Sequence, residues 1–179
     1  HISDPVLKKM NRKITRKEIE ATMSRVRSQL PDVAWRTTFI VGFPTETDQD
    51  FEELVDFVSE GHFQHLGIFL YSYEDNIRSS KFGDPIPLSL KEERKNRLME
   101  IQQKISREHH QKMVGSLQQV LVGGFSSETD LLLEGRNQYQ GPEVDGVVYI
   151  NEGNATSAGF HQVEITEAHE YDLVGKILN

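Results

Sequence analysis

The residues best suited to holding a small molecule lie in one apolar segment and the turn after it, at residues 36–45. Residues 39–41 form a continuous apolar run, as expected for a strand that is covered on both faces in a parallel sheet. In such sheets ligands bind beyond the carboxyl ends of the strands. We therefore expect Gly42, Phe43 and Pro44 to bring backbone groups close to a cofactor. A plain strand-to-helix turn is the alternative, because glycine and proline also favour it.

Polar side chains beside this turn are further candidates. Side chains alternate along a strand, so Arg36 and Thr38 share one face. An arginine that enters a buried strand needs a carboxylate partner. That partner is either a structural residue or the carboxylate of a ligand, and both interpretations stay open. Glu46 either approaches the same ligand or caps the helix expected at residues 47–60.

The sequence patterns of the segments that would position these residues predict parallel βα units. Thr15 and Glu18 have the spacing of a capping box, which indicates a helix start. The order of helix, strand, helix and strand is typical of an α/β fold. A charge run at residues 92–100 is interpreted as the solvated face of a helix. The expected elements are a short helix from Ser3, a helix over 15–30, strands over 36–43 and 65–73, a helix over 47–60, a loop over 75–87 and a helix over 89–113.

The sequence pattern changes near residue 114, where short predicted strands separated by turns begin. Five short strands in so few residues predict a small antiparallel barrel or sandwich. We therefore expect two domains, at residues 1–113 and 114–179. The expected strands are 117–122, 131–136, 144–150, 161–165 and 171–178, with turns at 123–124, 141–142 and 151–153.

Charge is unevenly distributed between these two parts. Residues 114–179 hold ten Asp or Glu and two basic residues, and so carry the whole net charge of −8. Phosphate backbones are bound by Lys and Arg, so this part should repel nucleic acid and attract a basic protein. A merely solvated acidic surface is the alternative. The carboxylates expected to contact a basic partner are Glu143, Asp145, Glu164, Glu167, Glu170 and Asp172.

Composition limits the remaining possibilities. The chain has no cysteine, so these residues cannot form a disulfide or a cysteine-ligated iron–sulfur cluster. No apolar run reaches the ~20 residues of a spanning helix, which predicts a cytoplasmic protein without membrane contact. Two parallel strands make an incomplete sheet. We therefore expect the chain to be the carboxyl-terminal part of a longer protein, and its exposed sheet edge could support self-association.

Ordered motifs over nearly the whole chain resemble the radical SAM methylthiotransferases, and specifically the branch that modifies a ribosomal protein (RimO type). The RNA-modifying branch usually has an aspartate in place of Thr38, and proline and arginine in place of Tyr73 and Glu74. The matching motifs are at residues 1–3, 6–10, 36–47, 67–69, 71–74, 94–103, 135–136, 142–150 and 171–175.

The resemblance implies a fold, a reaction and cofactors. It implies the last strands and helices of a radical SAM (β/α) barrel, followed by a small antiparallel, OB-like TRAM barrel. The full-length enzyme would use S-adenosylmethionine and two [4Fe-4S] clusters, with both cysteine sets outside this chain. It would methylthiolate the β-carbon of an aspartate in the twelfth protein of the small ribosomal subunit. The chain alone would bind none of these cofactors and be inactive, with its TRAM barrel binding the protein substrate.

The resemblance also assigns roles to residues after the second strand. Phe69 would pack on the adenine of the cofactor, with simple core packing as the alternative. Tyr71 and Glu74 would lie at the mouth through which the substrate enters. A transfer-RNA methylthiotransferase and a module that only binds a macromolecule remain the alternative functions.

Overall fold

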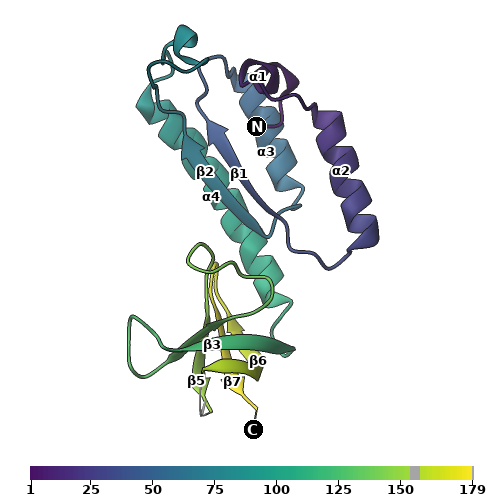
Figure 1. The fold of residues 1–179 in the computed structure, drawn as a ribbon, viewed down its shortest axis with the longest axis vertical. Coiled ribbons are helices and arrows are strands. Elements are labelled where there is room, and N and C mark those ends of the chain that lie inside the picture. Colours follow the sequence, from purple (N-terminus) through teal and green to yellow (C-terminus); the bar gives the residue numbers. More distant parts are fainter. Residues whose placement is uncertain (154–157, 179) are drawn as a thin grey trace. The chain divides into compact units, whose positions relative to one another are not determined.

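The computed structural model describes residues 1–153 and 158–178, which form two compact units, His1–Gln102 and Gln103–Asn179 (Figure 1). The first unit contains helices and a two-stranded sheet, and the second contains a barrel. No helix within the described residues has both the length and the apolar character that crossing a membrane requires.

The first unit has the expected order of elements. Capping boxes begin two of its helices, one formed by Thr15 with Glu18 and the other by Thr47 with Asp50. The elements are α1 (Asp4–Lys9), α2 (Arg16–Gln29), β1 (Arg36–Val41), α3 (Asp48–Ser59), β2 (His65–Leu70), the 3-10 helix η1 (Ser80–Phe82) and the greater part of α4 (Leu88–Gln111), whose last residues belong to the second unit.

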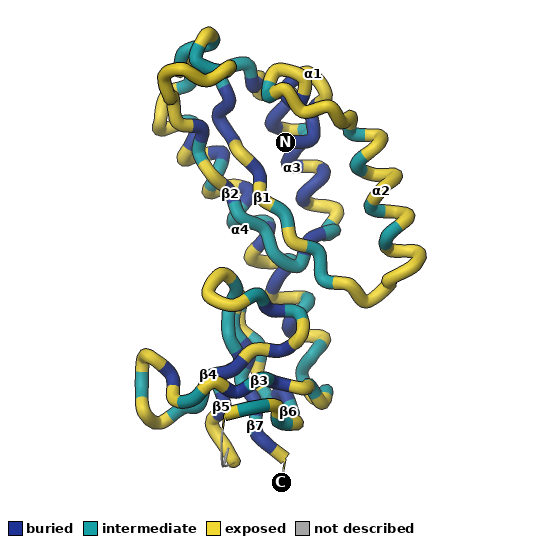
Figure 2. Tube along the Cα trace, viewed as in Figure 1, coloured by how far each residue is buried: buried dark blue, intermediate teal, exposed yellow. Residues whose placement is uncertain are grey.

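The sheet of the first unit pairs β1 with β2 in parallel, and helices cover one of its faces. Phe39 and Ile68 are partners in register on the covered face. Phe39 also makes an edge-on ring contact with Phe57 of α3, at a centroid distance of 6.5 Å. This apolar layer is the core of the unit, and Figure 2 shows its buried stretches in β1 and α3, whereas α2 has no buried residue.

The expectation that the sheet is covered on both faces is wrong for the described residues. Ile40 is 38% exposed, and its partner in register, Phe69, is 66% exposed. Arg36 and Thr38 alternate onto the same side of β1 and are also exposed. We call this side, defined by Arg36, Thr38, Ile40 and Phe69, the open face.

The second unit is a closed barrel with the strand order β3-β4-β5-β7-β6. Four of its five strand pairings are antiparallel, but β5 and β7 pair in parallel, which the expected all-antiparallel barrel does not include. Valine, isoleucine and leucine side chains fill its interior. Its strands are β3 (Leu117–Phe125), β4 (Leu133–Arg136), β5 (Val148–Glu152), β6 (Gly159–Ala168) and β7 (Leu173–Ile177).

Two details of the expected barrel are wrong. Gly123 and Gly124 do not form a turn, because they lie inside β3, where the register with β4 shifts after Val122. Such a bulge lets a strand bend around a small barrel. The strand expected at residues 144–150 begins only at Val148.

Candidate functional site

A buried carboxylate shapes the turn at the carboxyl end of β1. Gly42 has φ +74°, and its N–H donates to Oε2 of Glu46 at 2.9 Å. The backbone N–H of Glu46 donates in turn to the Phe43 carbonyl at 2.8 Å. The alternative that Glu46 caps α3 is wrong, because Thr47 is the N-cap and its hydroxyl accepts from the N–H of Asp50.

Two cations of α4 hold the ends of both strands. Arg94 donates to Glu46 at 2.7 Å and to Asp48 at 2.6 Å. Lys91 lies one helical turn earlier, and its ammonium donates to the Tyr71 carbonyl, just beyond β2, at 2.9 Å. Both cations are 3% exposed, so the interpretation of the 92–100 charge run as a solvated face is wrong for Arg94.

Lys91 also explains why position 42 is glycine. A Cβ atom added to Gly42 would lie 2.4 Å from Cγ of Lys91, and the positive φ is in a region that other residues rarely adopt. The turn therefore needs glycine both for its backbone conformation and for the close approach of the lysine stem.

A second buried carboxylate joins the start of the chain to α3. Asp50 accepts hydrogen bonds from the hydroxyls of Ser3 and Thr47. Burial would raise the pKa of Asp50, but these hydrogen bonds outweigh it and lower the pKa below its ordinary value. Nε2 of His1 lies 3.4 Å from Oε2 of Glu46, so the chain start also reaches the turn.

The predicted cofactor residues fall into two groups. Arg36, Thr38 and Phe69 lie on the open face, where a ligand could reach their side chains. Gly42 already uses its N–H for Glu46, and Phe43 is 3% exposed and contacts the Tyr71 ring at 5.3 Å. Pro44 is half-buried beside them. The turn is thus internally bonded, whereas the predicted residues with exposed side chains lie on the open face.

A cavity of about 510 Å³ lies at the carboxyl ends of β1 and β2 and brings Phe43, Tyr71 and Glu74 together. We call it the strand-end cavity. Sequence reasoning missed its three cations, although the basic run at residues 8–17 was a signal for two of them. Its lining residues include Lys9, Arg12, Ile40, Leu70, Ile77 and Arg78.

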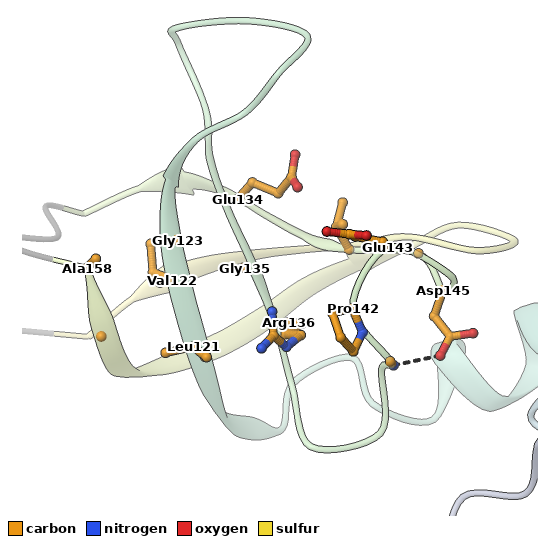
Figure 3. Close-up of a pocket in the computed structure, with 14 residues that line it drawn as sticks. Leu121, Val122, Gly123, Glu134, Gly135, Arg136, Pro142, Glu143, Asp145 and Ala158 are labelled. Atoms are coloured by element: carbon orange, nitrogen blue, oxygen red, sulfur yellow. Dashed lines mark hydrogen bonds between the residues drawn. The ribbon is translucent and has the colours of Figure 1, made fainter.

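A second cavity, of about 650 Å³, lies on the barrel and brings two of the predicted acidic residues together (Figure 3). Glu143 and Asp145 come from the loop between β4 and β5, and Asp145 accepts from the N–H of Gly141 at 2.6 Å. Glu134 and Arg136 of β4 line the same cavity and were not predicted. We call it the barrel pocket, and its lining holds three carboxylates and one guanidinium.

The other four predicted carboxylates lie outside the barrel pocket. Glu164 pairs with Lys176 at 3.3 Å, and Glu170 pairs with Arg107 at 3.3 Å. Asp172 accepts from the N–H of Val147 at 2.8 Å and so holds a loop. Glu167 is exposed on β6, with its carboxylate 4.0 Å from His169.

Comparisons with known proteins identify both units. Residues 1–58 match the radical SAM superfamily, and residues 114–178 match the TRAM domain. The chain therefore combines a radical SAM segment with a TRAM barrel, as the resemblance implied.

Curated relatives match the chain along its whole length. The ribosomal protein uS12 methylthiotransferase RimO of Bdellovibrio bacteriovorus is 50% identical over 99% of this chain. Proteins with the same name from Desulfotalea psychrophila and Geobacter sulfurreducens are 45% and 42% identical over 100% of it. The chain belongs to the radical SAM methylthiotransferase family. It spans 39–40% of the length of these three relatives.

Proposed function

We propose that the chain is the carboxyl-terminal part of an enzyme that methylthiolates the β-carbon of an aspartate in ribosomal protein uS12. The observation that carries the proposal is the similarity, along the whole chain, to relatives named for that reaction. Such an enzyme would work in the cytoplasm, where ribosomal proteins are assembled.

The open face supports a role in holding S-adenosylmethionine. Ile40 and Phe69 are neighbours in register and form an apolar surface that a folded protein normally covers. Phe69 would pack on the adenine, while Arg36 and Thr38 would supply polar contacts at the same face. S-adenosylmethionine, together with a [4Fe-4S] cluster, would supply the radical chemistry.

The cluster ligands would lie outside these residues, because the chain has no cysteine. Within the described residues, His, Asp and Glu do not form a group of three that could hold a metal. From the resemblance to this family, we expect the full-length enzyme to carry two [4Fe-4S] clusters and the chain alone to be inactive.

The reaction itself is the first test. The full-length enzyme, prepared without oxygen and with reconstituted clusters, is incubated with S-adenosylmethionine, a low-potential reductant that supplies electrons to the cluster, a sulfide source and uS12. Peptide mapping should find a methylthio group on one aspartate, and the 179-residue chain should yield none. Modification of transfer RNA, with uS12 unchanged, would instead support the transfer-RNA alternative.

The barrel pocket supports binding of a basic protein. Glu134, Glu143 and Asp145 outnumber Arg136 in its lining, so a lysine or arginine side chain of uS12 would be attracted to it. Glu143 has no described partner that it would have to leave.

A titration of the chain with uS12 tests this role. Glu134→Gln with Glu143→Gln should weaken binding about tenfold, because two favourable charge contacts are lost. Glu152→Gln with Glu128→Gln removes the same charge from exposed positions outside the pocket and serves as the control. Equal weakening by both pairs would show only a general charge effect. Binding of uS12 without any methylthiolation by the full-length enzyme would favour a module that only binds.

Self-association through the sheet edge is a separate expectation for the chain alone. Within the described residues β1 pairs only with β2, so each strand has an unpaired edge. Light scattering at increasing concentration should show dimers or larger species, and a constant monomer mass would contradict this expectation.

A further inference from the structure

The lining of the strand-end cavity combines three cations, which we call the cationic rim, with apolar side chains. Lys9 and Arg12 come from the end of α1 and the segment after it, and Arg78 comes from the loop after β2. Glu74 is the one carboxylate in the lining, so the described lining has an excess of positive charge. Ile40, Leu70 and Ile77 supply the apolar part of the lining.

The cations of this rim have no carboxylate partners among the described residues. Arg12 and Arg78 are exposed and make no described ion pair. The ammonium of Lys9 lies 5.5 Å from the centroid of the Phe82 ring, and that of Lys81 lies 5.0 Å from the same centroid. Both ammoniums thus contact the face of an aromatic ring, and neither is neutralised by a carboxylate within the described residues.

A buried donor in the same cavity lacks a partner. Tyr71 is 8% exposed, and its hydroxyl makes no hydrogen bond within the described structure. An unsatisfied buried hydroxyl costs about 1–3 kcal/mol. Tyr71 is part of the cavity lining, and a ligand oxygen that reached its hydroxyl would satisfy it.

The chain beside the cavity extends the positive surface. Residues 8–17 contain six Lys or Arg and no Asp or Glu. Of these, Lys8, Lys13 and Lys17 are exposed and have no described partner. A single small anion would use only the rim, whereas a repeating anion could also use these lysines.

We propose that the strand-end cavity and the lysines beside it bind the phosphate backbone of RNA. Guanidinium groups match phosphate in a bidentate geometry, so Arg12 and Arg78 would hold one phosphate with the Tyr71 hydroxyl. Lys8, Lys9 and Lys13 would contact phosphates on either side. RNA is favoured over an acidic protein because, on the proposed function, the substrate is a ribosomal protein and lies against ribosomal RNA.

The test measures binding of the chain to a labelled single-stranded RNA by fluorescence anisotropy over a salt series. Binding should weaken with salt, with a slope of about −0.7 for each phosphate contacted. Arg12→Gln with Arg78→Gln should weaken binding about tenfold and reduce the slope by about 0.7, because the one phosphate that both arginines hold is lost. Arg25→Gln with Lys104→Gln removes the same charge from exposed positions and is the control.

Further variants and competitors make the result decisive. Tyr71→Phe keeps the ring and should weaken RNA binding several-fold, with the urea midpoint unchanged or raised. Equal weakening by the two double variants, or no weakening by either, would overturn the proposal. Displacement of the RNA by polyglutamate or by anionic vesicles as effectively as by unlabelled RNA would also overturn it.

The RNA-binding proposal and the proposed reaction can fail independently of each other. Loss of RNA binding alone, with free uS12 still methylthiolated by the full-length enzyme, would count against the RNA site only. RNA binding as described, with no methylthiolation of uS12, would count against the proposed reaction only.

Discussion

Glu46 is the residue on which the turn after β1 depends. Its side chain is fully buried, and it links the backbone of Gly42 to a guanidinium that is 4% exposed. A buried carboxylate without a partner is strongly unfavourable, so these groups are expected to act as a unit. The turn is therefore held by side chains as well as by its own backbone.

Removal of the guanidinium tests that dependence. Arg94→Gln should lower the free energy of unfolding by about 3–5 kcal/mol, because Glu46 is left buried without its cation. Arg97→Gln is the control, since it breaks an exposed pair with Glu52 and should change stability by only about 0–1 kcal/mol. Urea unfolding followed by the fluorescence of Trp35, the single tryptophan, measures both. Similar losses in the two variants would contradict the buried-pair account.

A substitution at Gly42 separates backbone strain from steric conflict. Gly42→Ala places a methyl group against the Lys91 stem, whereas Gly61→Ala has a similar φ of +73° and no atom within 4 Å. The free energy of unfolding of both variants should fall by about 1 kcal/mol, because alanine is unfavourable in a left-handed backbone conformation. Gly42→Ala should lose about 1–3 kcal/mol more from overpacking, as measured by the same urea unfolding. Equal losses would show that Lys91 moves aside freely.

The buried carboxylate of Asp50 should make the stability of the first unit depend on pH. Its pKa is lower in the folded chain than in the unfolded chain. Its contribution is therefore complete above the unfolded pKa of about 4 and is lost as pH falls through the lower folded value. Ser3→Ala removes one of the hydrogen bonds that lower the pKa, so the acid-induced loss should become smaller by about 1 kcal/mol. Urea unfolding between pH 6 and pH 3 should show this, and an unchanged pH dependence would contradict it.

At the scale of elements, the two faces of the sheet differ in burial, although each carries large apolar side chains. Ile68 points into the core and is 6% exposed, while its neighbour Phe69 is 66% exposed. Packing therefore depends on one face of β2 and leaves the other free for a ligand.

Alanine substitutions measure that difference. Ile68→Ala should lower stability by about 2–5 kcal/mol, because it leaves a cavity in the core. Phe69→Ala should change it by no more than about 0.5 kcal/mol, as at other exposed positions. Thermal unfolding of the two variants gives the comparison, and a large loss for Phe69→Ala would show that the open face is covered in solution.

The elements also show what the sequence could predict. Caps, turns and apolar spacing are local signals, and they correctly placed the helices at Thr15 and Thr47. The burial of Arg94 depends on a carboxylate 48 residues away, which no local pattern reveals. An apolar run such as residues 39–41 likewise indicates two apolar faces without showing which one a helix covers.

The candidate sites likewise show that residues close together in the chain can be predicted as a group, whereas residues brought together by the fold cannot. Tyr71 and Glu74 were predicted together because they lie close in the chain at the end of one strand. Lys9 and Arg12 meet them only through the fold, so sequence reasoning missed them, whereas Arg78 lies four residues after Glu74 and a local pattern could have included it. In the barrel, the pairing of β4 with β5 brings Glu134 and Arg136 close to the loop that contains Glu143. The sequence alone could not predict this pairing.

Over the whole molecule, charge is divided between the units. The net charge of −8 lies in residues 114–179, whereas the strand-end cavity of the first unit has a cationic rim. On the two proposals, these surfaces would serve a basic protein and an RNA respectively. An enzyme acting on a ribonucleoprotein would gain from both.

The acidic barrel should become more stable with added salt. An excess of one sign of charge destabilises a compact state, and salt screens the repulsion. Raising sodium chloride from ~20 to ~300 mM should increase the free energy of opening by about 0.5–1 kcal/mol. Hydrogen exchange at the core amides of Val163 and Ile165 measures it, and a decrease would contradict the account.

The spacing of Lys91 and Arg94 limits how α4 can change in evolution. The two side chains lie three positions apart, and each holds the end of a different strand. One residue inserted between them would rotate one cation by about 100° around the helix axis, and one strand end would lose its anchor. Insertions and deletions between these positions should therefore be eliminated by selection, while charge substitutions on the solvent side of the same helix turn accumulate freely.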